Sequence, residues 1–89
     1  MRRRVIFSIA AENEIGSFFE DYNNNFAKRV LIYRRIREFL SDFDFSKAYI
    51  MNSKKYIDIA DICKIEYITR KNATEVLVIN IYLNETLNF

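Results

Sequence analysis

The sequence predicts a two-layer α+β domain, and three observations carry this prediction. The stretch from Ile62 to Leu83 contains two period-two segments joined by a polar turn, a pattern typical of paired strands. Two earlier segments, 10–24 and 26–43, place apolar residues at helical spacing. The chain has one Gly and no Pro, so long regular elements with short connections are expected.

The chain is expected to begin with a strand and a helix. Apolar residues alternate with others over residues 3–9, which predicts a strand with Val5, Phe7 and Ile9 on one face. Ser8, or the turn that follows it, is a candidate for capping the helix over 10–24. An apolar stripe along this helix comprises Ala11, Ile15, Phe18, Phe19 and Tyr22. Gly16 within it costs about 1 kcal/mol relative to Ala unless close packing requires Gly there.

A second helix is predicted over residues 26–43. Its residues expected in the core are Ile32, Ile36, Phe39, Leu40 and Phe43. The three asparagines at 23–25 favour the end of the first helix. Because this connection is short, the two helices should form an antiparallel hairpin.

The remaining chain is expected to form a meander of strands. Residues 55–60 alternate as a strand, whereas residues 47–51 fit either a short strand or a turn. Four aliphatic residues should share one face of the last strand: Leu77, Ile79, Ile81 and Leu83. The order β-α-α-β-β-β then gives a single domain over 1–89, with an antiparallel sheet covered on one face by the helical hairpin.

Composition excludes several kinds of chemistry. The chain has no His, so His-based catalysis and His-ligated metal sites are excluded, and no metal or cofactor is expected. The single cysteine, Cys63, is expected to be a small buried residue in a reducing compartment. The apolar run 5–11 is too short to cross a membrane, so a cytoplasmic protein without membrane contact is expected. Hydrophobic residues make up 51% of the chain, which suggests that a partner chain, or a second copy, covers some apolar surface.

The basic residues cluster on certain elements. Five of them are candidates for contacts with RNA or with a partner: Lys28, Arg34, Arg35, Arg70 and Lys71. Such groups either form solvated faces or bind phosphate or an acidic partner.

The order and local pattern resemble the RelE/ParE superfamily of toxins from bacterial type II toxin–antitoxin systems. RVIFSIAAENEIGSFFEDY is similar to the opening strand and helix of that family, and KYIDIADICKIEYITRKNATEVLVINIYL is similar to its closing meander. In the segment 63–67, a basic residue lies within an aliphatic strand that ends in Tyr, as in the family. The resemblance covers nearly the whole chain and implies the two-layer RelE/ParE-like fold.

The resemblance also implies function. RelE-like toxins cut messenger RNA on the ribosome, ParE-like toxins poison DNA gyrase, and an antitoxin that wraps the toxin neutralises both. By position in the family pattern, catalytic candidates here are Lys54, Lys55 and Lys64. Residues 83–89 lack the Arg or His and the terminal Tyr that RelE-like enzymes carry in this region.

Three hypotheses follow. The first is a toxin that acts on the translation machinery or DNA gyrase and is silenced by a cognate antitoxin. The second is a ribosome-dependent endoribonuclease that uses the three lysines. The third is a non-toxic α+β interaction module.

Overall fold

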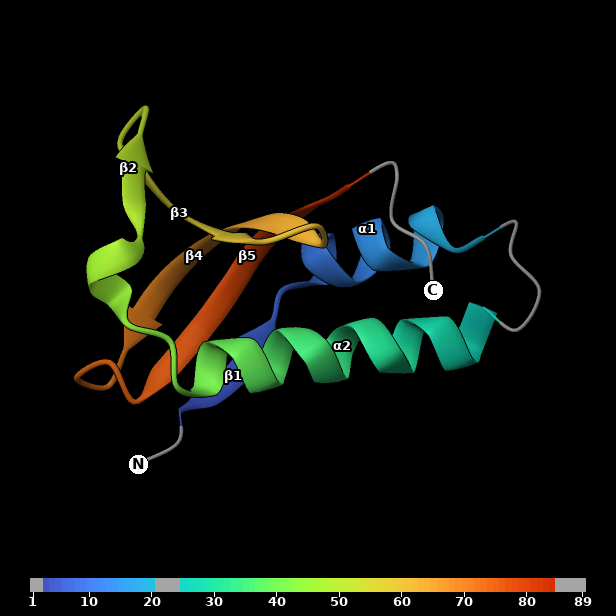
Figure 1. Cartoon of the computed structure of the whole chain (residues 1–89), viewed down its shortest axis with the longest axis horizontal. Coiled ribbons are helices and arrows are strands. Elements are labelled where there is room, and N and C mark those ends of the chain that lie inside the picture. Colours follow the sequence, from blue (N-terminus) through green and yellow to red (C-terminus); the bar gives the residue numbers. More distant parts are fainter. Residues whose placement is uncertain (1–2, 21–24, 85–89) are drawn as a thin grey trace.

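The computed structural model describes residues 3–20 and 25–84, which form two helices over a five-stranded sheet (Figure 1). The elements are β1 (Arg4–Phe7), α1 (Ile9–Phe18), α2 (Asn25–Ser41), the 3-10 helix η1 (Phe45–Lys47), β2 (Tyr49–Met51), β3 (Lys54–Ile59), β4 (Cys63–Arg70) and β5 (Glu75–Leu83). The predicted α+β class is confirmed. Residues 49–51, for which the sequence left two choices, form a strand.

The sheet is mixed and has the strand order β1-β5-β4-β3-β2. From β2 to β5 each strand runs antiparallel to the next, as expected for a meander. The prediction of a wholly antiparallel sheet was wrong, because β1 pairs with β5 in parallel. No tight turn joins these two strands, so chain connectivity does not force them to be antiparallel.

A β-bulge divides β5 into two parts with opposite side-chain directions. Glu66 pairs with Asn80 and the next residue, Tyr67, pairs with Val78, so Ile79 is the extra residue. Before the bulge, Val76 and Val78 are fully buried; after it, Ile81 is buried and Leu83 packs against the core. The prediction that Leu77 and Ile79 share the buried face was therefore wrong, because one inserted residue exchanges the faces of a strand.

Ser8 lies between the end of β1 and the start of α1. Its Oγ accepts a hydrogen bond from the backbone N–H of Ala11 at 3.0 Å, so of the two candidates it is Ser8 that caps the helix. Because the chain turns into the helix here, Ile9 leaves the strand face on which it was predicted and is 77% exposed. The helix ends at Phe18, earlier than residue 24. Tyr22 and the link 21–24 lie outside the described residues.

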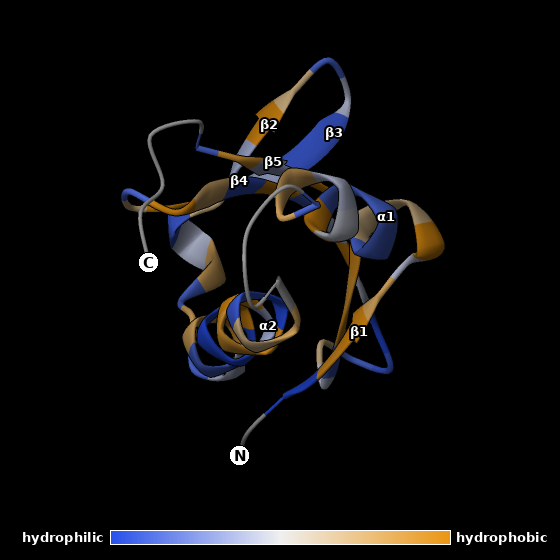
Figure 2. Ribbon diagram, turned by 90° about the vertical axis from the view of Figure 1, so that its right-hand side faces the viewer, coloured by the Kyte–Doolittle hydropathy of each residue, from blue (hydrophilic) through white to orange (hydrophobic). Residues whose placement is uncertain are grey.

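Both helices contribute to one hydrophobic core with the strands. In α1 the buried stripe is Ala11 and Ile15, continued by Phe19 directly after the helix. In α2 it is Ile32, Ile36 and Leu40, flanked by partly buried Phe39 and by Phe43 just after the helix. Figure 2, turned so that α2 is seen nearly end-on, shows the helix within the curve formed by β1 and the central strands. Cys63 is buried in the same core, as predicted.

In the described part of the chain, three turns use left-handed backbone without glycine, one of them at Asp61 between β3 and β4, where φ is 61°. Asn52 and Ser53 join β2 to β3 with φ of 53° and 64°, as a two-residue hairpin turn requires. Lys71, Asn72 and Ala73 between β4 and β5 are also left-handed. Asn tolerates this conformation well, but Ala73 adopts it at a steric cost.

Candidate functional site

A groove runs between β1 and α2 at one edge of the sheet. β1 is an edge strand, so one side of its backbone has no neighbouring strand. The groove has a volume of about 570 Å³, and its walls include Val5, Val30, Tyr33, Arg34 and Arg37. An unpaired strand edge beside apolar and basic side chains is suited to an extended segment of another chain.

Aromatic rings position one of the basic side chains of this groove. The guanidinium carbon of Arg37 lies 5.0 Å from the centroid of the Phe7 ring and 5.9 Å from that of Tyr33. The two rings meet edge to face with centroids 4.8 Å apart. Burial, and then the charge of Glu12, raises the pKa of Tyr33 against the opposing effect of Arg29 and Arg37, so this phenol stays neutral at physiological pH.

The charge of the groove is mainly positive. Arg34 and Arg37 are exposed on α2, and Glu38 is the acidic residue that lines the same groove. Glu12 lines the adjoining surface along β1. None of the ion pairs found within residues 3–20 and 25–84 involves Arg34 or Arg37. These two guanidinium groups therefore keep their capacity to bind carboxylates or phosphates.

A second polar cluster lies on the outer face, which we define as the sheet face opposite the core residues Ile57, Ile65 and Ile81. The Nζ of Lys64 lies 5.1 Å from the centroid of the Tyr56 ring and 5.4 Å from that of Tyr82. Beside it, Asn80 donates a hydrogen bond to Oε1 of Glu66 at 2.9 Å. The positive charge of Lys64 is thus held between two aromatic rings.

Two further residues extend this cluster toward the sheet edge. The Tyr49 ring stacks on Tyr56 with centroids 5.8 Å apart, and its hydroxyl donates a hydrogen bond to Oδ1 of Asp58 at 2.7 Å. This hydrogen bond, with smaller contributions from burial and the charge of Asp58, raises the pKa of Tyr49 to about 12. Tyr49 is therefore a poor source of phenolate at neutral pH.

The three lysines predicted as catalytic do not lie together. Lys54 and Lys55 are neighbours on one strand, so their side chains point to opposite faces of the sheet. Lys54 shares the outer face with Lys64, but the two are far apart along the sheet. Lys64 pairs with Asp58 of β3, and Lys54 lies four residues from Asp58 on that strand, a separation of about 13 Å. Lys55 lines a hollow on the other face with Tyr67 and Ile50.

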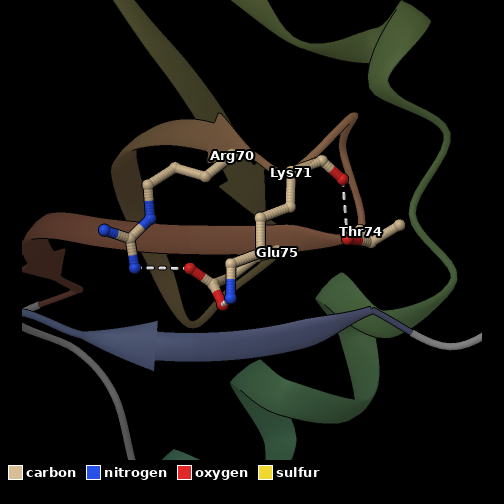
Figure 3. A network of polar contacts seen from close by, with 4 residues as sticks. All are labelled: Arg70, Lys71, Thr74 and Glu75. Atoms are coloured by element: carbon tan, nitrogen blue, oxygen red, sulfur yellow. Dashed lines mark hydrogen bonds and ion pairs between the residues drawn. The ribbon is translucent and has the colours of Figure 1, made fainter.

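The residues predicted to contact RNA or a partner divide into two groups. Lys28, Arg34 and Arg35 lie on α2, where the two arginines are exposed. Arg70 and Lys71 instead surround the buried carboxylate of Glu75 at the β4–β5 turn (Figure 3). The Lys71 Nζ is 3.6 Å from Oε2 of Glu75, and Arg70 contacts Oε1. These two cations therefore already have an intramolecular partner.

Sequence reasoning missed two features of these sites. The alternation in the strands places Tyr56, Lys64 and Tyr82 on one face, but only the strand register brings them side by side. The groove exists because β1 is an edge strand next to α2. The residue pattern does not predict that place of β1 in the sheet. Within the described part of the chain, no cluster of His, Cys, Asp and Glu is arranged to hold a metal ion.

Two further observations bear on the protein class. Among residues 3–20 and 25–84, no helix combines the length and the hydropathy needed to cross a bilayer. Comparisons of the chain with models of protein families, with curated proteins and with solved structures found no match.

Proposed function

We propose that this chain is the toxin of a bacterial toxin–antitoxin pair, which stops growth by acting on the translation machinery or DNA gyrase. A cognate antitoxin silences it by occupying the groove between β1 and α2. The observation that carries the proposal is the unpaired edge of β1 beside exposed Arg34 and Arg37. The α+β order of elements, which resembles the RelE/ParE pattern, supports the same reading.

The chemistry of the groove defines the antitoxin segment. An extended segment adds a strand to β1 through main-chain hydrogen bonds, and its apolar side chains pack on Val5, Val30 and Tyr33. Acidic side chains of the segment pair with Arg34 and Arg37, where opposite charges accelerate association and select the partner.

Growth under inducible expression in a bacterial host tests the toxin itself. We expect induction to stop growth, and co-expression of a short antitoxin encoded beside the gene to restore it. Messenger RNA ends and plasmid supercoiling, both measured after induction, separate the translation machinery from gyrase as the target. A chain whose expression leaves growth unchanged would be an interaction module without toxicity.

Charge reversal tests the groove. The double variant Arg34→Glu/Arg37→Glu should still stop growth but should no longer be rescued by the antitoxin, because like charges then face each other. Lys47→Glu, a charge reversal at an exposed lysine of η1 outside the groove, is the control and should be rescued as the wild type is. If the antitoxin rescues the double variant fully, the groove is not its binding site.

The endoribonuclease hypothesis has its own test. After induction, an enzyme would leave new messenger RNA ends that disappear in the triple variant Lys54→Ala/Lys55→Ala/Lys64→Ala. Because Lys55 lies on the face opposite Lys54 and Lys64, we expect the triple variant to keep its toxicity. Loss of both toxicity and new ends would favour the enzyme.

A further inference from the structure

A hollow of about 310 Å³ lies beside the β2–β3 hairpin, on the face of the sheet that carries Tyr67 of the core. Its walls are mainly apolar and include Phe45, Ala48, Ile50 and Tyr67. Phe45 and Tyr67 stack with ring centroids 5.3 Å apart, which fixes one wall. The hollow shares no lining residue with the groove between β1 and α2, so the two are separate surfaces.

The edge of β2 forms the rim of this hollow. β2 is the other edge strand of the sheet, and Figure 1 shows its hairpin projecting away from α2. In a two-residue hairpin, Met51 and Lys54 form the hydrogen-bonded pair next to the turn. By alternation, the backbone N–H and C=O of Ile50 point away from the sheet, and its side chain is 71% exposed. This rim offers hydrogen bonds and apolar surface together.

The charged residue that lines the hollow is Lys55. Lys47 and Lys54 are exposed on neighbouring elements, Lys54 on the opposite face of the sheet, and none of the three takes part in an ion pair that the structure shows among the described residues. Two carboxylates of the flanking surface are already engaged. Asp44 accepts a hydrogen bond from the backbone N–H of Ser46 at 3.0 Å, and Asp58 accepts one from Tyr49. The uncompensated charge nearest the apolar walls is therefore that of Lys55.

We propose that this hollow and the edge of β2 bind an extended acidic segment of a protein partner, with one apolar side chain in the hollow and a neighbouring carboxylate on Lys55. The segment pairs with the outward-facing backbone of Ile50, and its side chains alternate between the hollow and solvent. A second copy of this chain fits less well, since two-fold pairing of β2 would bring the lysines of both copies together. This surface is independent of the proposed antitoxin groove.

Selection from a random nine-residue peptide library displayed on phage tests the proposal on the full chain. The enriched peptides should combine an apolar residue with Asp or Glu two positions away, because side chains of a strand point to the same face at every second residue. An enriched peptide should bind Lys55→Glu about ten-fold more weakly, since charge reversal replaces attraction at the rim with repulsion. Lys54→Glu is the matched control, because it makes the same change one residue away on the opposite face, and its affinity should stay within about two-fold.

Amide chemical shifts of the labelled protein locate the peptide. We expect the largest changes at Ile50, Lys55 and Thr69, with Val5 and Arg34 unaffected. Ile50→Asp should weaken binding as well, and its circular dichroism should match the wild type because Ile50 is exposed. The proposal is overturned if the library yields no enriched peptide or if the enriched peptides lack acidic residues. An equal loss of peptide affinity in Lys54→Glu and Lys55→Glu would also overturn it. So would amide shift changes confined to the groove between β1 and α2, or concentration-dependent self-association through Ile50.

Discussion

The guanidinium of Arg3 donates a hydrogen bond from Nη1 to the carbonyl oxygen of Phe43 at 2.9 Å, across 40 residues of chain. Its Nε donates to the carbonyl of Ala73 at 3.2 Å, and its Cζ lies 4.4 Å from the centroid of the Phe45 ring. Arg3 thus joins the start of β1 to the end of α2 and to the β4–β5 turn. A cation is also favourable here because the carbonyl end of a helix is electronegative.

Removal of the Arg3 side chain should therefore destabilise the protein. We expect Arg3→Ala to lower the free energy of unfolding by about 1–3 kcal/mol, as for charged hydrogen bonds to carbonyl oxygens. Arg3→Lys should recover only part of this, because an ammonium cannot reach the separate carbonyls as a planar fork does. Urea denaturation measures both, with exposed Arg4→Ala as the control that should change stability by less than about 0.5 kcal/mol. Equal stabilities of Arg3→Ala and Arg4→Ala would contradict the anchoring role.

Gly16 has no structural need to be glycine. A Cβ built at this position would lie 3.7 Å from Nη2 of Arg29 and 3.8 Å from its Cζ, which are ordinary contact distances. We therefore expect Gly16→Ala to stabilise the protein by about 0.5–1 kcal/mol, because Ala restricts the unfolded chain and favours the helix. Thermal denaturation followed by circular dichroism measures the shift. A lower melting temperature for the Ala variant would show that the site requires glycine for another reason.

The thiol of Cys63 should be unreactive in the folded protein. Burial, and then the charge of Asp58, raises the pKa of Cys63 to about 12, whereas an ordinary thiol titrates near 8.5. At pH 8 the thiolate population of Cys63 is therefore about a thousand-fold lower than that of an exposed cysteine. The reaction is slowed accordingly, because the thiolate is the reacting species. A disulfide reagent should modify the native protein slowly and the urea-unfolded protein at the rate of a free cysteine. Fast modification without denaturant would show that this part of β4 is open to solvent.

The sequence predicted local structure well and its long-range arrangement less well. The helical spacing of Ile32, Ile36 and Leu40 correctly predicted the core face of α2, because that pattern is set by the local geometry of the helix. The parallel direction of β1 depends on the path of the whole chain. The bulge at Ile79 depends on how β4 and β5 fit together, and an inserted residue leaves no period of its own in the sequence.

The candidate sites follow the same division. On α2, Arg34 and Arg35 are exposed, since they lie away from the apolar stripe, whereas Lys28 is half-buried. From the sequence, Arg70 and Lys71 were equally good candidates for binding RNA or a partner. In the structure both contact Glu75, which the folded turn brings between them. Lys54 and Lys55 looked like one basic pair, although strand geometry separates them onto two faces.

Glu75 gives the protein a pH-dependent contribution to stability. Burial alone would raise the pKa of its carboxyl group, but the hydrogen bond and charge of Arg70, with the charge of Lys71, outweigh burial and lower it. A carboxyl group whose pKa is lower in the folded state stabilises that state fully above its unfolded pKa, about 4.3. This contribution is lost as the pH falls through the lower pKa of the folded state.

Glu75→Gln tests this sign directly. At pH 7 the variant should have a smaller free energy of unfolding than the wild type, and the difference should shrink as the pH falls from about 4.3, the unfolded pKa, through the lower pKa of Glu75 in the folded state. The pKa of Asp44 is also lowered, chiefly by its hydrogen bonds to Ser46, so the wild type alone would mix two acid titrations. Because both proteins keep Asp44, the difference between their urea denaturation curves isolates Glu75. A difference that stays constant from pH 7 to pH 3 would mean that Arg70 and Lys71 do not stabilise the charged form of Glu75.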